Sequence, residues 1–125
     1  MKLLDYAKVE LIQKGLIKTT YKDGALVNVN HLEEIRRVYS DIAGTDDLKD
    51  IRLLVVFDGD IEMSRDVADR YLVADRHRTK VAEAFVVKTE AAKEYVNAAT
   101  AILSGKHPIK VFENEETALN WLLSH

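Results

Sequence analysis

The alternation of hydrophobic and polar residues predicts the first strands of this chain. Apolar residues stand at every second position from Ala7 to Leu11, and β-branched and aromatic residues mark a second strand from Leu16 to Tyr21. Because only a short turn at Lys14-Gly15 separates them, these strands are expected to form an antiparallel hairpin. The stretch from Ile51 to Phe57 is apolar except for Arg52, which predicts a central parallel strand buried on both faces.

Apolar stripes spaced three or four residues apart predict four helices. The first stripe runs from Leu32 to Ile42; Asn30 with Glu33 is interpreted as the capping box that begins this helix, and Gly44 as its end. The later helices are expected to follow the N-cap residues Ser64, Thr89 and Asn114. Gly105 is expected to end the third helix.

Two further short strands complete the expected fold. They cover Ala82 to Val87 and Ile109 to Phe112, and Pro108 suits the first residue of an edge strand. The element order is therefore ββαβαβαβα. This order predicts an α/β fold in one domain over residues 1–125, with a mixed, mostly parallel five-stranded sheet and four helices.

Composition narrows the class of protein. The chain of 125 residues contains no cysteine, which excludes disulfides and thiolate metal sites. Its longest apolar run, Leu53 to Phe57, is far shorter than the roughly 20 residues of a membrane-spanning helix. The net charge of −3 argues against binding nucleic acid. Without a secretory signal at Met1 to Tyr6, we expect a cytoplasmic protein.

The C-terminal segment from Lys110 to Leu122 resembles the end of the SpoIIAA-like proteins, bacterial relatives of the STAS domain (sulfate transporter and anti-sigma-factor antagonist). The shared features are a strand closing in Phe112, then acidic residues, Ala118-Leu119 and Trp121-Leu122. The opening hairpin and the helix after Ser64 also agree with the order of elements in the SpoIIAA-like proteins. The resemblance implies a STAS-like fold and a non-enzymatic regulatory or binding module. We expect such a module to act through protein partners, such as a kinase or an anti-sigma-like protein, or through a small apolar ligand.

Ser64 is the candidate phosphoacceptor. In the sporulation members of the resembling family, a serine at the start of the helix after the central strand accepts phosphate. The family pattern there is Asp-Ser and a small residue, whereas this chain has Met63-Ser64-Arg65. A phosphate would be favoured by the helix N-terminus and by Arg65. The structural alternative is an N-cap that satisfies a free backbone N–H group.

Asp58 and Asp60 carry the alternative function. They follow the buried strand, where α/β proteins place chemistry, and Asp-x-Asp after a hydrophobic strand resembles the haloacid-dehalogenase phosphatases. That resemblance implies a small magnesium-dependent phosphate-handling enzyme with Asp58 as nucleophile and Asp60 as acid/base. The other interpretation, which we prefer, is a solvated turn that at most contacts a ligand or partner.

The remaining polar groups are interpreted as surface features. None of the histidines (His31, His77, His107 and His125) has the spacing of a metal site, so no metal or cofactor is expected. The basic run from Arg76 to Lys80 is interpreted as a solvated helix end, although it could hold a phosphate-bearing ligand or an acidic partner.

Aromatic residues at helical spacing predict packing in the core. Trp121 is the exception that we single out, because its exposure would favour a homodimer through the last helix. A crevice between helices and sheet that takes a lipid-like molecule is the other binding mode considered.

Overall fold

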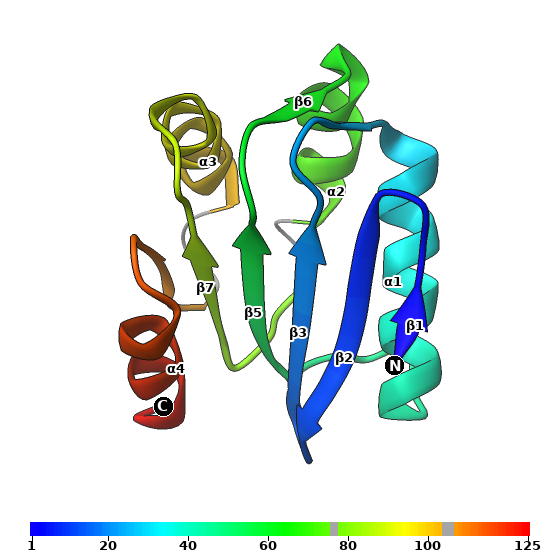
Figure 1. Ribbon diagram of the computed structural model, residues 1–125. Coiled ribbons are helices and arrows are strands. Elements are labelled where there is room, and N and C mark those ends of the chain that lie inside the picture. The colour runs from blue at the N-terminus through cyan, green and yellow to red at the C-terminus, as the bar shows by residue number, and fades with distance from the viewer. Residues whose placement is uncertain (76–77, 104–106) are drawn as a thin grey trace.

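The computed structural model describes residues 1–75, 78–103 and 107–125 (Figure 1). Its main sheet has the strand order β1-β2-β3-β5-β7-β8. The bounds of these strands are Lys2–Leu3 (β1), Ala7–Gln13 (β2), Leu16–Tyr21 (β3), Arg52–Phe57 (β5), Ala82–Val86 (β7) and Ile109–Phe112 (β8). A smaller parallel sheet pairs β4 (Ala25–Val27) with β6 (Ile61–Met63).

The pairing of the main sheet confirms the predicted mixed topology. β2 and β3 form the expected antiparallel hairpin, and β3, β5, β7 and β8 are parallel to one another. The apolar strand β5 lies between β3 and β7, and the strand after Pro108 lies at the edge. The expectation of five strands was wrong by one, because β1 adds a sixth strand at the other edge. β1, β4 and β6 have only two or three residues each, too few to show a hydrophobic period.

Helices cover both faces of the main sheet (Figure 1). Three helical segments lie on one face: α1 (Val29–Ala43), the π-helix η1 (Val67–Leu72) that continues into α2 (Val73–Asp75), and α3 (Glu90–Leu103). The fourth, α4 (Glu115–Leu123), covers the opposite face. Among the described residues, no helix combines the length and the apolar character needed to cross a bilayer.

The side chains of β5 pack into two separate hydrophobic cores, as expected for a strand buried on both faces. Leu53, Val55 and Phe57 pack in the larger core under α1, η1 and α3. Leu54 and Val56 point the other way, into the smaller core under α4. This alternation follows from the two-residue period of a strand. The larger core is the one that holds the cavity described below.

The helix ends confirm some predicted caps and correct one. Gly44 ends α1 with a φ of 74°, in the left-handed region that glycine tolerates. The capping box of α1, however, pairs Asn28 with His31, so that the prediction for Asn30 and Glu33 was wrong by two residues. The His31 ring replaces the usual Glu because its Nδ1 accepts the Asn28 N–H at 3.1 Å.

Two of the later caps are confirmed. The Thr89 hydroxyl accepts the Ala92 N–H at 3.2 Å, and the Asn114 side chain accepts the Thr117 N–H at 3.0 Å. Gly105, the expected end of α3, lies outside the described residues. The second helix differs most from its prediction, because Val67–Leu72 forms a π-helix and not an α-helix. Its wider turn buries Val67 and Leu72, five residues apart, against the same core.

Candidate functional site

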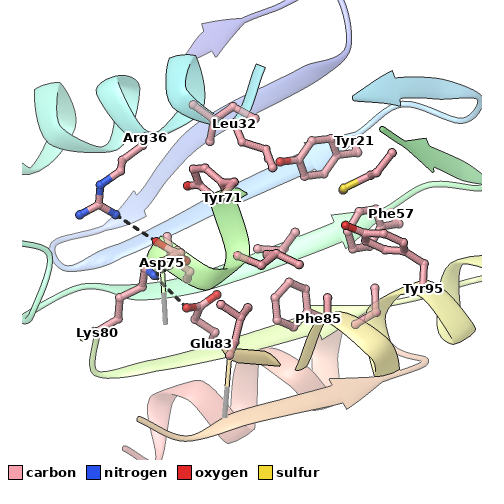
Figure 2. A pocket seen from close by; sticks show the side chains of 18 of the residues that line it. Tyr21, Leu32, Arg36, Phe57, Tyr71, Asp75, Lys80, Glu83, Phe85 and Tyr95 are labelled. Carbon is pink, nitrogen blue, oxygen red and sulfur yellow. Dashed lines mark hydrogen bonds and ion pairs between the residues drawn. The ribbon is translucent and has the colours of Figure 1, made fainter. Parts of the chain in front are cut away.

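A cavity of about 80 Å³ lies between the main sheet and the helices α1, η1 and α3. Most of its lining is apolar or aromatic, from Tyr21, Leu32, Ile35, Tyr39, Leu53, Val55, Phe57, Met63, Tyr71, Leu72, Phe85, Tyr95, Val96, Ala99 and Leu103. The rest is charged, from Arg36, Asp75, Lys80 and Glu83. Figure 2 shows the charged side chains gathered at one end and the aromatic rings of Phe57, Phe85 and Tyr95 at the other.

The aromatic end carries tyrosine hydroxyls. The rings of Tyr21 and Phe57 stack with centroids 5.2 Å apart, and Phe57 stacks on Phe85 at 6.4 Å. Tyr39 hydrogen-bonds Thr19 at 2.5 Å. Burial raises the pKa of Tyr95 to about 12 and that of Tyr21 well above its usual value, which nearby phenol groups raise further. These hydroxyls therefore stay protonated and can donate hydrogen bonds over the whole neutral range.

The charged end is built around Lys80. Its ammonium Nζ lies 2.9 Å from a Glu83 carboxylate oxygen and 3.3 Å from one of Asp75, and its side chain is 3 % exposed. Burial alone would raise the pKa of Glu83, but the charge of Lys80 and hydrogen bonds from His107 and Lys80 outweigh it and lower that pKa. Both carboxylates of this buried group are therefore paired, as burial of charge requires.

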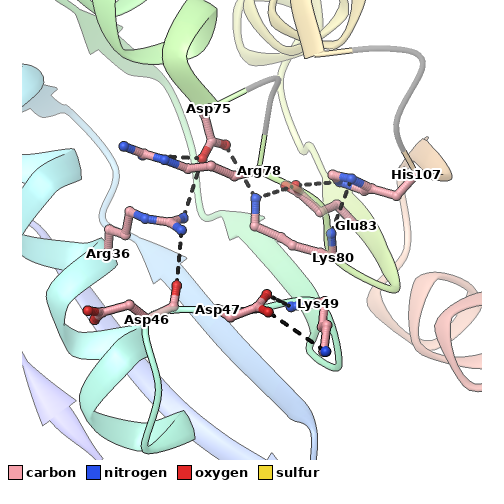
Figure 3. Close-up of polar contacts among 9 residues, drawn as sticks. All are labelled: Arg36, Asp46, Asp47, Lys49, Asp75, Arg78, Lys80, Glu83 and His107. Atoms are coloured by element: carbon pink, nitrogen blue, oxygen red, sulfur yellow. Dashed lines mark hydrogen bonds and ion pairs between the residues drawn. The ribbon is translucent and has the colours of Figure 1, made fainter.

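Three more side chains surround this pair of acids (Figure 3). Arg36 and Arg78 each place a guanidinium nitrogen near an Asp75 oxygen, at 3.5 and 3.7 Å. His107 accepts the Lys80 backbone N–H through Nδ1 at 3.3 Å, while its Nε2 lies 2.8 Å from Glu83. Because Nδ1 accepts in this arrangement, Nε2 is the ring nitrogen that donates to Glu83.

This cluster corrects two predictions. Lys80 lies in the buried interior and not on the solvated helix end that was expected, and His107 is 5 % exposed where a surface histidine was expected. Arg76 and His77, from the same predicted run and set of histidines, lie outside the described residues. The one sequence signal for the cluster was Glu83, a lone carboxylate inside the otherwise apolar strand β7. A charge in such a strand indicates a buried partner.

The structure places Asp58 and Asp60 away from this cavity's charged end. Asp58 is half exposed and pairs with Lys88 at 3.2 Å. The Asp60 side chain is exposed, and its backbone N–H donates to the Asp23 carboxylate at 2.9 Å. Within residues 1–75, 78–103 and 107–125, no three His, Cys, Asp or Glu side chains come together as metal ligands. The hydrogen bonds of this segment therefore reach Lys88 and Asp23, which lie elsewhere in the sequence.

The other candidates are scattered over the molecule. Ser64 precedes η1, where its carbonyl accepts the Val67 N–H at 3.1 Å and its hydroxyl donates to the Asp66 carboxylate. Arg65 is exposed. Trp121 lies on α4, across the sheet from the cavity, and is half-buried against Phe112 with ring centroids 5.6 Å apart. These residues do not join one site.

A mixed sheet with this strand order and helices on both faces defines a SpoIIAA-like α/β fold, as the C-terminal segment indicated. The chain is similar to the crystal structure of an uncharacterised protein of the DUF3478 family with a SpoIIAA-like fold from Shewanella loihica PV-4. The two share 18 % sequence identity with a TM-score of 0.60, over 98 % of each chain.

The family itself is shown by sequence. Residues 11–125 match the family described as a domain of unknown function, DUF7793, and the chain belongs to that family. No match to a curated protein was found. The comparisons therefore establish fold and family, and the function has to be argued from the site.

Proposed function

We propose that this chain is a non-enzymatic binding module of the STAS-like type whose ligand is a small, mainly apolar molecule. The cavity between the main sheet and α1, η1 and α3 is the observation that carries the proposal. Protein interiors are normally packed without such voids, and a concave apolar site with a few polar groups is the usual form of a ligand site. Its position under the π-helix η1 adds support, because π-helical turns are frequent at functional sites.

The size of the cavity limits the ligand. Its volume of about 80 Å³ is below the roughly 150 Å³ of an engineered apolar cavity that binds benzene. A long-chain lipid therefore requires η1 to move, whereas a molecule with a few heavy atoms requires only small adjustments. Regulation through Ser64, contact with a kinase or anti-sigma-like protein, a homodimer and a cytoplasmic location stay predictions.

Nuclear magnetic resonance of the full chain tests the proposal. Isobutanol and dissolved xenon are expected to shift the amide and methyl signals of cavity residues such as Val96 and Leu103. Ala99→Leu places three more carbon atoms in the cavity and is expected to abolish those shifts. The matched control is Ala98→Leu, at an exposed position of the same helix, which is expected to bind as the unmodified chain does.

Two outcomes contradict the proposal. One is the absence of shifts at cavity residues with both probes. The other is binding that Ala99→Leu leaves intact although circular dichroism shows the variant folded, because the probes then bind elsewhere.

A further inference from the structure

The buried charged group beside the cavity holds more positive than negative charge. Its members are the cations Arg36, Arg78 and Lys80 and the anions Asp75 and Glu83. His107 donates to Glu83 and adds no negative charge to this group. The residues at 76–77 and 104–106, which the structure does not describe, include no Asp or Glu in the sequence. The group therefore carries one positive charge in excess. The Arg78 side chain is 34 % exposed, so solvent takes up part of that charge, whereas Arg36 and Lys80 are more deeply buried.

The nearest loop does not supply the missing negative charge. Asp46 meets Arg36 through its backbone carbonyl at 3.5 Å, and Figure 3 shows its carboxylate turned away. Asp47 lies 3.9 Å from Lys49 instead, with both side chains well exposed. Among the described residues, no carboxylate other than those of Asp75 and Glu83 forms an ion pair with Arg36, Arg78 or Lys80.

Arg36 has the capacity to bind such an anion. Its guanidinium has five N–H donors, yet its contacts among the described residues are one Asp75 oxygen and the Asp46 carbonyl, each at 3.5 Å. Both contacts are at the outer limit of a hydrogen bond. Lys80, by contrast, is held by two carboxylates at 2.9 and 3.3 Å. Arg36 lines the cavity with a side chain only 16 % exposed, and guanidinium binds carboxylate in a bidentate way.

Tyr71 extends this polar end toward the apolar one. Figure 2 shows its ring between Arg36 and the aromatic side chains, with the hydroxyl on the side of Arg36. That hydroxyl has no hydrogen-bond partner among residues 1–75, 78–103 and 107–125, and burial raises its pKa, so it remains a donor. Beyond it, Phe57 and Phe85 offer only apolar surface.

The geometry points to a small carboxylate as the ligand of this cavity, with its carboxylate on Arg36 and Tyr71 and its apolar body against Phe57 and Phe85. This inference rests on the proposed function and names the chemical class of the ligand. It explains in one arrangement the excess positive charge, the unused donors of Arg36 and the polar and apolar ends of the cavity.

The test compares isobutyrate with isobutyramide, a neutral molecule of the same shape, by titration of the full chain followed by nuclear magnetic resonance. Isobutyrate is expected to bind about tenfold or more tightly than the amide, as a charge-assisted hydrogen bond provides. Arg36→Gln is expected to remove that preference. Its control is Arg37→Gln, one residue along the same helix and exposed, which is expected to keep it. Tyr71→Phe, which removes only the hydroxyl, is expected to weaken isobutyrate binding severalfold and serves if Arg36→Gln does not fold.

The possible failures are distinguishable. Equal affinity for acid and amide overturns the carboxylate inference, and so does a preference that survives both Arg36→Gln and Tyr71→Phe. Binding of isobutanol or xenon under those conditions still supports the proposed function. If neither acid nor amide binds while isobutanol does, the inference is again overturned and the cavity takes only neutral molecules. If no probe shifts the cavity residues, the proposed function fails together with the inference.

Discussion

Removing the charge of Lys80 is expected to destabilise the protein strongly. The substitution Lys80→Met keeps an unbranched apolar side chain but leaves Glu83 and Asp75 without the ammonium that lies 2.9 and 3.3 Å from them. Breaking a buried ion pair on one side costs about 3–5 kcal/mol. His107 and two arginines still contact these carboxylates in the variant. We therefore expect a loss of free energy of unfolding at the lower end of this range, about 3 kcal/mol at neutral pH.

The pH dependence of that loss separates charge from packing. In the unmodified chain the pKa of Glu83 is below its usual 4.5, so its contribution to stability is present above pH 4.5 and disappears as the pH falls through the lowered pKa. Lys80 is the main cause of the lowering. In Lys80→Met the pKa of Glu83 is expected to rise above that of the unfolded chain. The folded variant then binds a proton more readily than the unfolded variant does, and this binding stabilises the fold as the pH falls. The deficit of Lys80→Met should therefore shrink as the pH falls toward about 4, by about 1.4 kcal/mol for each unit of pKa change.

Urea unfolding followed by circular dichroism measures both quantities. The control is Lys88→Met, which removes the partner of Asp58 from a pair with both side chains about half exposed, and which is expected to cost about 0–1 kcal/mol. A Lys80→Met deficit no larger than that of the control would refute the electrostatic reasoning. A large deficit that does not change with pH would refute it too, because it would indicate lost packing.

The buried tyrosines and Gly59 are expected to affect stability as well. All five tyrosines have raised pKa values, including about 12 for Tyr95, so the tyrosinate absorbance of the folded chain should stay low at pH 10–11 and rise with unfolding. Because a raised folded pKa gives stability that is lost as the pH increases, unfolding in urea should become easier above pH 10; a gradual titration of the folded chain near pH 10 would contradict this. Gly59→Ala would place a Cβ 2.9 Å from the Asp23 Cβ and disturb its hydrogen bond to the Asp60 N–H, costing about 1–3 kcal/mol by urea unfolding. In an Asp23→Ala background the same change should cost much less, and an equal cost would contradict the reasoning.

The sequence predicted those parts of the fold in which a regular pattern of apolar residues continues over a whole strand or helix. β5, α1 and α3 have six or more residues with a regular spacing of apolar positions, and the strand order follows once the hairpin and crossovers are known. The π-helix was not predicted, because a turn in which Val67 and Leu72 share one face differs from an α-helical turn by only one residue. Tertiary packing under α1 and α3 decides between the two.

The site was less predictable than the fold. The cavity is formed by residues from several strands and helices, and no local pattern reports how closely those elements pack. The motifs that drew attention, Asp58-x-Asp60 and Ser64, are short sequence signals that also describe ordinary turns and helix starts. Glu83 was the informative residue, since a carboxylate within a buried strand needs a cation nearby. The partners could not be deduced: Lys80 lies only three residues before Glu83, but no local pattern shows that its side chain is buried, and His107 lies 24 residues away.

An unfilled cavity costs stability, which is the reason to connect it with binding. At about 24 cal/mol per Å³, a closed void of about 80 Å³ would cost roughly 2 kcal/mol, and because this cavity is partly open that figure is its upper limit. Selection for stability alone would fill it, for example with leucine at Ala99. If Ala99→Leu raises the free energy of unfolding while it abolishes binding, the void is kept for its occupant. If the variant is instead less stable by the 1–3 kcal/mol typical of an overpacked core, the surrounding side chains leave no room for a larger residue at this position. The cavity would then be a consequence of how the helices and the sheet pack, and it would not support binding of a ligand.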